Sequence, residues 1–173
     1  MSTLKVNNLI PRTGSGVHMA GHVIQLLSTT KTDVFAFNNN VVQAIPGLSV
    51  IITPKFATSK IYITADVVGS VPTTSRGFMG LYRGGSILLQ GDAAGSRIRA
   101  AAQLANDNAG EGISSTISYL DSPNSTSALT YQIYGINEGG QYTSILINRS
   151  PDDGDNASRG RFVSTITAME VAQ

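Results

Sequence analysis

The sequence predicts an all-β domain, an antiparallel sandwich of the jelly-roll type. Apolar and polar residues alternate at every second position in many short stretches, which is the pattern of strands with one buried face. Gly, Pro, Asn and Ser separate these stretches at intervals typical of sandwiches and jelly rolls. With 173 residues, the chain is long enough to bury one core without disulfides or metals.

The stretch Ser59–Ser70 shows this alternation most clearly. Ile61, Ile63, Ala65 and Val67 fall on one side of a strand, because successive side chains point to opposite faces. The other side carries Lys60, Tyr62, Thr64 and Asp66. We therefore expect one apolar, buried face and one wetter face.

Residues 1–20 are predicted to form an extended arm and a flexible joint that precede the β-domain at 21–173. Residues 3–10 alternate loosely, Pro11 ends the alternation, and Arg12–Gly21 contains three glycines without periodicity. A single short strand is not stable alone, so the arm should pair with its own domain, a sister subunit or a docking partner. The residues expected to make this attachment are Leu4, Val6, Leu9 and Ile10.

About ten strands are predicted after the arm. In the first half of the domain, Asn38–Asn40 marks a turn, and Pro46 with Gly47 parts two strands. The strands expected in this half are His22–Thr29, Phe35–Phe37, Val41–Ile45, Leu48–Thr53, Ser59–Ser70, Arg76–Arg83 and Ser86–Gln90.

In the second half, Asp121–Ser125 and Glu138–Gly140 mark turns. The strands expected here are Arg97–Leu104, Ile113–Leu120, Ala128–Ile136, Tyr142–Asn148 and Phe162–Val171. The alanines of Arg97–Leu104 favour a helix, but its position within a series of strands favours a strand, which we predict. Phe162–Val171 is apolar or small on both sides, as expected for a strand that is covered on both faces.

Composition limits the classes of function. The net charge is +1 and only 13% of the residues are charged, so we do not expect a nucleic-acid-binding protein. The absence of Cys excludes cysteine nucleophiles and zinc–thiolate sites. The first ten residues contain no long apolar run, so neither a signal peptide nor a membrane-spanning segment is expected. Without a secretion signal, the glycosylation patterns at Asn124, Asn148 and Asn156 are expected to be fortuitous.

Five segments of the chain resemble those of a known protein family. The opening is similar to the short N-terminal stretch of many phage fibre and virion structural proteins, and it reads T-L-K-V-N-N-L-I-P-R-T-G-S-G-V. A β-domain common in phages of marine and freshwater bacteria, cyanophages especially, is similar in I-P-G-L-S-V-I-I-T-P-K-F-A-T-S-K-I-Y-I, Q-G-D-A-A-G-S-R, Y-L-D-S-P-N-S-T-S-A-L-T-Y-Q-I and V-S-T-I-T-A-M-E-V-A. The resemblance covers nearly the whole chain, and its motifs are strands and turns rather than a catalytic signature.

This resemblance implies a trimeric jelly roll like that of tumour necrosis factor, located on a virion fibre, knob or spike. A jelly roll can pack one face on sister subunits around a three-fold axis. The residues expected at such a trimer interface are Phe78, Tyr62, Tyr119, Tyr131 and Tyr134. The alternative is that these aromatic side chains fill the core of each subunit.

No cofactor or metal is predicted. His18 and His22 would share a metal on a helix, but nearby glycines disfavour a helix, so solvated loop histidines are expected. Asp152–Asn156 is acidic enough for Ca²⁺. It lacks the alternate ligand spacing and the closing Glu of an EF-hand loop, so an Asp- and Gly-rich turn is expected.

Asp66, Asp121 and Glu170 are the acids within strands or at their ends. A glycosidase needs two carboxylates that flank a sugar bond, and the sequence pairs none of these three. Arginines beside turns could bind acidic sugars on a bacterial surface, or pair with acidic residues within or between subunits. These arginines are Arg76, Arg83, Arg97, Arg99, Arg149, Arg159 and Arg161.

The sequence therefore favours a non-enzymatic virion structural protein, a homotrimeric tail fibre, knob or spike. Its arm would attach to other virion proteins, and its far loops would contact a bacterial surface glycan or protein. One alternative is a capsid decoration or head fibre protein. A second is a depolymerase that cuts surface polysaccharide. A third, a carbohydrate-binding module, is disfavoured because the sequence shows no exposed aromatic platform.

Overall fold

A computed structural model describes residues 19–37, 42–71, 76–105, 112–137 and 145–173. These residues form eleven β-strands and no helix, which confirms the all-β prediction. The strands are β1 (Val23–Lys31), β2 (Phe35–Phe37), β3 (Gln43–Ile52), β4 (Lys60–Ser70), β5 (Arg76–Arg83), β6 (Ser86–Leu89), β7 (Ala102–Ala105), β8 (Ile113–Asp121), β9 (Leu129–Asn137), β10 (Ile145–Ile147) and β11 (Ser164–Val171). The described part of the chain thus holds no helix that could cross a membrane.

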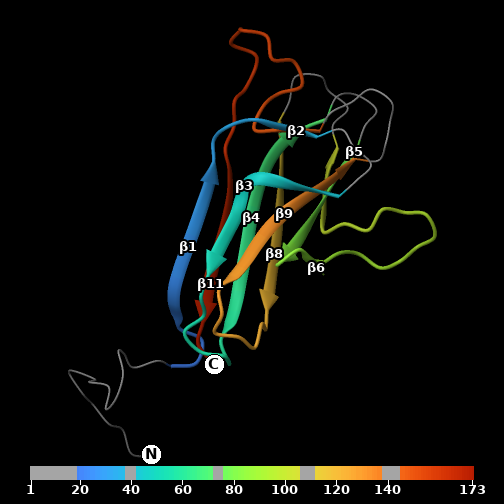
Figure 1. Cartoon of the computed structure of the whole chain (residues 1–173). Helices are drawn as coiled ribbons and strands as arrows, with labels where there is room; N and C mark the ends of the chain where they lie inside the picture. The colour runs from blue at the N-terminus through green and yellow to red at the C-terminus, as the bar shows by residue number, and fades with distance from the viewer. Residues whose placement is uncertain (1–18, 38–41, 72–75, 106–111, 138–144) are drawn as a thin grey trace, which may run out of the picture.

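The strands form two antiparallel sheets that pack face to face (Figure 1). Sheet A has the order β1-β11-β4-β10-β2, and β8 pairs with β4. Sheet B has the order β3-β9-β5-β6, and β7 also pairs with β5. Without the short strands β2, β6 and β10, eight strands remain, and we number these from one to eight in chain order. Sheet A then has the order β1-β11-β4-β8, which is 1-8-3-6, and sheet B has the order β3-β9-β5-β7, which is 2-7-4-5. This is the strand order of a jelly roll.

One core lies between the two sheets. The predicted alternation of β4 is confirmed, since Ile61, Ile63, Ala65 and Val67 are all fully buried. Sheet B contributes residues such as Leu48, Leu81 and Ile133 to the same cluster. Burial of this apolar surface is the main force that holds the two sheets together.

Two predicted strands are one strand in the structure. Of the expected strands Val41–Ile45 and Leu48–Thr53, residues 43–45 and 48–52 belong to β3, and residue 41 lies outside the described residues. The strand β3 runs through Pro46 and Gly47 with a register shift in its pairing to β9. Gly47 has a φ of +78°, a value that a glycine adopts without a steric penalty. Because β3 is an edge strand of sheet B, Pro46 removes no hydrogen bond that a neighbouring strand requires.

The strand predicted at Arg97–Leu104 is largely wrong. Only β7 (Ala102–Ala105) is a strand, and residues 90–101 form a loop that projects from the sandwich, drawn yellow-green in Figure 1. The reason lies in β5, which pairs with β9 on one edge and with both β6 and β7 on the other. Since β6 already occupies the edge opposite Leu81–Arg83, a longer β7 has no partner there.

The last strand is covered on one face only within the subunit. Its inward residues, Ser164, Ile166, Ala168 and Glu170, are buried, but its outward residues are half-exposed. Phe162–Val171 therefore differs from the prediction of a strand covered on both faces. Of the expected strand Tyr142–Asn148, the structure describes β10, while residues 142–144 lie outside the described residues.

Candidate functional site

The structure separates the aromatic residues predicted at a trimer interface. Tyr131 is fully buried in the core of its own subunit, and this corrects its assignment to an interface. Tyr119 packs against the same core from β8. Tyr62 lies on the outer side of sheet A, whereas Phe78 on β5 and Tyr134 on β9 lie on the outer side of sheet B, where their register partners are Ile136 and Gly80. One flat interface therefore cannot contain all five residues.

The predicted attachment residues of the arm lie outside the described residues. They are Leu4, Val6, Leu9 and Ile10. His18 is outside as well, and His22 is exposed. The described residues contain no cluster of three His, Cys, Asp or Glu side chains that could hold a metal ion.

Register places side chains that are far apart in sequence in common rows on the outer side of sheet A. The rows run across β1, β11, β4 and β8. The first row is apolar and consists of Leu26, Met169, Tyr62 and Leu120. The second and third rows are Ser28, Thr167, Thr64 and Ser118, followed by Thr30, Thr165, Asp66 and Thr116. We call these three rows the outer surface of sheet A.

The apolar row leaves large side chains in water. Leu26, Tyr62 and Leu120 are 56%, 37% and 48% exposed, respectively. Val23, at the start of β1 and paired with Val171, extends the apolar area toward the end of the sheet. Contiguous apolar patches are uncommon on monomeric proteins and mark interaction surfaces.

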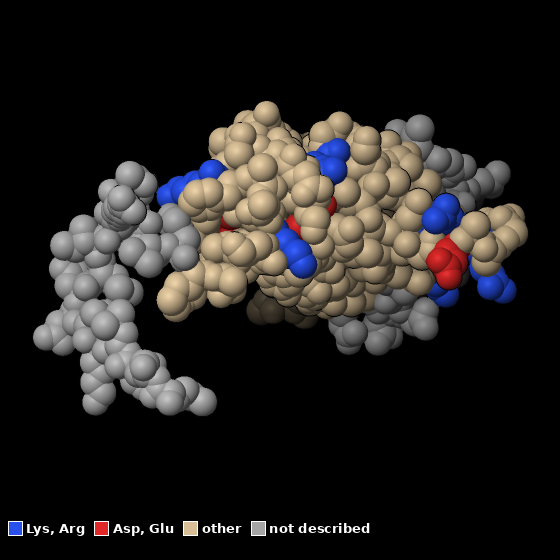
Figure 2. All heavy atoms as spheres, turned by 90° about the horizontal axis from the view of Figure 1, so that it is seen from below, with Lys and Arg blue, Asp and Glu red and all other residues tan. Residues whose placement is uncertain are grey.

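The hydroxyl rows are linked by hydrogen bonds and carry little charge. The hydroxyl oxygens of Ser28 and Thr167 lie 3.0 Å apart, and the Thr116 hydroxyl donates a 2.6 Å bond to Oδ1 of Asp66. Asp66 is the only charged residue in the three rows. Figure 2 views the molecule from below, and most of the described surface that it shows is uncharged.

The three candidate catalytic carboxylates have separate environments. Glu170 is fully buried and accepts hydrogen bonds from Nε2 of Gln25 (2.5 Å) and the backbone N–H of Lys55 (2.8 Å). Asp121 is also buried, and it accepts bonds from Arg83 and Tyr131. Both therefore stabilise the fold through bonds within the chain, and exposed Asp66 lies on the opposite side of sheet A from them.

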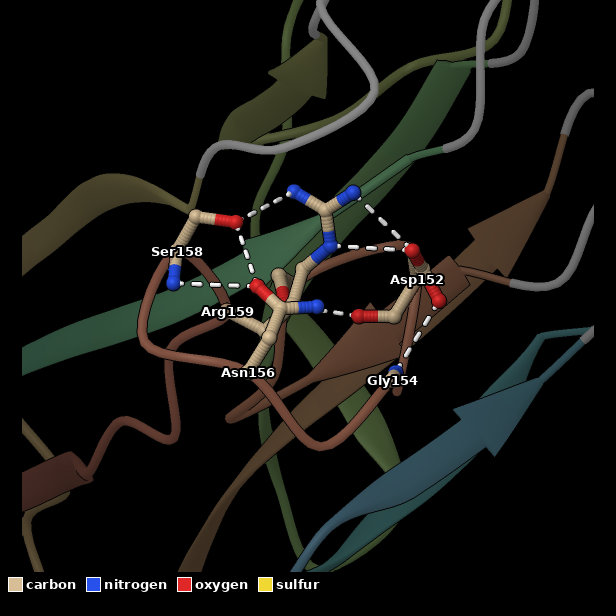
Figure 3. Close-up of polar contacts among 6 residues, drawn as sticks. Asp152, Gly154, Asn156, Ser158 and Arg159 are labelled. Carbon is tan, nitrogen blue, oxygen red and sulfur yellow. Dashed lines mark hydrogen bonds and ion pairs between the residues drawn. The ribbon is translucent and has the colours of Figure 1, made fainter.

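Residues 149–161 form a loop in which arginines neutralise the acidic turn. Figure 3 shows one of these contacts, between Arg159 and Asp152. Arg159 donates from Nε and Nη2 to Oδ2 of Asp152 at 2.9 Å, and Asp152 Oδ1 also accepts the backbone N–H of Gly154. Arg149 and Arg161 both pair with Asp153 at 2.6 Å. The bond from Gly154 and the adjacent Arg159 lower the pKa of Asp152. The segment is thus a self-neutralised turn, in agreement with the sequence analysis.

Asn148, the second residue with a glycosylation pattern, is fully buried. Its amide nitrogen donates to the backbone oxygens of Lys31 (2.8 Å) and Asp33 (3.0 Å), and its oxygen accepts from Ser164 (2.6 Å). A glycan cannot occupy this position in the folded protein, because the amide nitrogen lies inside the sandwich.

Comparisons with known proteins do not assign a family. No family model matches the chain, and no curated protein is detectably similar to it. Among solved structures, a chain in the structure of infectious bursal disease virus Gx strain aligns with a TM-score of 0.40 and 14% identity. The alignment covers 98% of this chain and 43% of the viral chain. A likeness at this level indicates no shared function.

Proposed function

We propose that this protein is a non-enzymatic phage virion structural protein. It forms a homotrimer through the outer surface of sheet A, and its N-terminal arm attaches the trimer to other virion proteins. The observation that carries the proposal is the exposed apolar row of Leu26, Met169, Tyr62 and Leu120 across four neighbouring strands. Burial of such a row in an interface removes apolar surface from water.

Copies of the same chain are the partner that suits this surface. Interfaces between subunits are depleted of charge in their centre, and this surface has one charged residue in its three rows. Ser and Thr hydroxyls both donate and accept hydrogen bonds, so rows of hydroxyls can face similar rows without repulsion. Three copies close into a ring around an axis, as cyclic symmetry requires.

The virion location rests on the resemblance of the sequence to tailed-phage structural proteins. The arm–joint–domain order supports an anchored trimer, in which Leu4, Val6, Leu9 and Ile10 contact the particle. The loops at the far end of the sandwich would then be free to contact the host surface.

Light scattering during size-exclusion chromatography of the full chain tests the trimer. We expect the mass of three chains for the natural protein. The double variant Tyr62→Lys with Leu120→Lys should give monomers, because it places charge in the apolar row. The matched control is Ile51→Lys, which adds charge at an exposed residue of β3 in sheet B and should leave the trimer intact. A monomeric natural protein, or equal dissociation of the control, would contradict the proposed interface.

Deletion of residues 1–16 tests the attachment separately. The shortened protein should fold and form trimers but fail to enter particles. Normal incorporation would exclude the arm as the anchor. Antibody labelling of intact particles then distinguishes a tail fibre from a capsid decoration protein.

A further inference from the structure

A groove on the outer side of sheet B is lined by the sheet and by the loop of residues 90–101. Figure 1 shows this loop projecting from the sandwich. Its volume is about 280 Å³. The sheet provides Tyr82 and Tyr134 as one wall, and the loop provides Gln90, Arg97 and Arg99 as the other. Ligand sites in proteins are typically concave and mainly apolar, with a few polar groups that orient the ligand, and this groove has that composition.

The tyrosine wall is an aromatic platform that the sequence did not reveal. The rings of Tyr82 and Tyr134 are stacked, with centroids 4.2 Å apart and an angle of 24° between their planes. Both side chains are half-exposed, and their hydroxyls have no hydrogen-bond partner among the described residues. Gly80 is the register partner of Tyr134, and its lack of a side chain leaves space for the Tyr82 ring. A Cβ at Gly80 would crowd that ring, because it would lie only 3.1 Å from Cε2 of Tyr82.

The loop wall supplies unpaired positive charge. The Arg99 Nε donates to the Gly91 oxygen at 2.7 Å, and the Gly91 N–H donates to the Ala100 oxygen at 3.0 Å, so the loop closes on itself. The other N–H groups of the Arg99 guanidinium have no hydrogen-bond partner among the described residues. Arg97 is exposed, and its guanidinium has no partner in the described part of the chain. Asp92 is nearby on the same loop and forms no ion pair with either arginine.

We propose that this groove binds an acidic oligosaccharide, a chain of sugars that carry carboxylates. The C–H face of a sugar ring can pack on the tyrosine rings, and the Gln90 amide can donate to and accept from sugar hydroxyls. A guanidinium binds a carboxylate through two parallel N–H bonds, which fits Arg97 and Arg99. A nucleic acid is disfavoured, because its binding depends on many phosphate contacts, whereas this groove has two arginines and the protein a net charge of +1.

The groove would stay open in the proposed trimer. It lies on sheet B, and the proposed interface lies on the outer side of sheet A, so the two surfaces face opposite directions. Binding of saccharide therefore does not depend on the trimer, and a failure of either proposal leaves the other to be tested on its own.

Isothermal titration calorimetry with the full chain tests the groove. The probes are oligogalacturonate, a neutral oligosaccharide of the same length, and inorganic polyphosphate. We expect oligogalacturonate to bind at least about tenfold more tightly than the neutral probe and polyphosphate. Arg97→Gln and Tyr134→Leu should each weaken binding by about tenfold or more, and raised salt should weaken it as well.

The control is Arg161→Gln, which removes an exposed arginine from the loop at 149–161 and should bind oligogalacturonate as the natural protein does. Thermal unfolding of each variant verifies that it is folded. The proposal is overturned by absence of oligogalacturonate binding, by equal or tighter binding of the neutral probe or polyphosphate, or by an equal loss in Arg161→Gln.

Discussion

The phenol of Tyr131 on β9 donates a 2.6 Å hydrogen bond to Oδ2 of Asp121 on β8, and this bond joins the two sheets inside the sandwich. Arg83 on β5 donates to the same carboxylate oxygen, so sheet B supplies both donors. Burial raises the pKa of Tyr131 far above its ordinary value, and the bond to Asp121 raises it further. The phenol therefore stays protonated and remains a donor throughout the physiological pH range.

Substitution Tyr131→Phe should lower the free energy of unfolding by about 1–3 kcal/mol. The ring would still fill the core, but the buried carboxylate of Asp121 would lose one of its two donors. Urea denaturation followed by circular dichroism measures the change. Tyr119→Phe is the control, because the Tyr119 hydroxyl has no partner among the described residues, and its effect should be under about 0.5 kcal/mol. Equal effects of the two substitutions would show that the bond does not stabilise the fold.

Glu170 should make stability depend on pH in the acidic range. Its burial raises the pKa, but hydrogen bonds from Gln25 and from the backbone of Lys55 and Phe56 to the charged form outweigh this effect, and the pKa is lowered from 4.5. The unfolded chain thus binds a proton at Glu170 more readily than the folded chain does. The resulting stabilisation is complete above the unfolded pKa and is lost as the pH falls through the lower folded pKa.

The variant Glu170→Gln tests this dependence by urea denaturation between pH 7 and pH 3. It should be less stable than the natural protein at pH 7, and the difference should shrink as the pH falls below about 4.5. The control Asp155→Asn changes an exposed loop residue and should retain the natural pH profile. A difference that stays constant with pH would contradict the assigned role of the Glu170 charge.

The sequence predicted the strands well where alternation and turns coincide, but it could not predict which surfaces meet. In β4 the apolar positions identified the buried face, and the structure confirms it. Leu26 and Leu120 lie in one row only because β1 and β8 are both linked to β4, through β11 in the case of β1. Register of this kind depends on pairing between distant segments and leaves no local signal.

The aromatic residues show the same limit. Tyr131 and Tyr134 are three positions apart in one strand, so alternation places them on opposite faces. It does not say which face is inside. Tyr82 joins Tyr134 only through the diagonal neighbours of the β5–β9 pair, and the loop with Arg97 completes the groove from elsewhere in the chain. Because Arg97–Leu104 was predicted to be a strand, the sequence did not indicate this loop.

Asn148 should be more sensitive to replacement by Ala than by Gly. Its φ of +64° is a left-handed conformation that glycine adopts freely and alanine does not. Both replacements remove its three side-chain hydrogen bonds to Lys31, Asp33 and Ser164. Asn148→Ala adds backbone strain, so we expect it to be about 1 kcal/mol less stable than Asn148→Gly in urea denaturation. Equal stability of the two variants would show that the backbone relaxes at this position.

Calcium should not stabilise the protein, although Asp152, Asp153 and Asp155 form the most acidic segment of the chain. Arg159 occupies the carboxylate of Asp152, and two further arginines occupy that of Asp153, so a cation would have to displace guanidinium groups. Binding to the folded state alone would raise the melting temperature, and the rise would grow with the logarithm of the ligand concentration once that exceeds the dissociation constant. We therefore expect no shift in melting temperature when millimolar CaCl₂ replaces NaCl at equal ionic strength. Arg159→Gln frees one carboxylate and serves as the comparison. A rise of several degrees in the natural protein, which EDTA reverses, would show that the loop binds calcium after all.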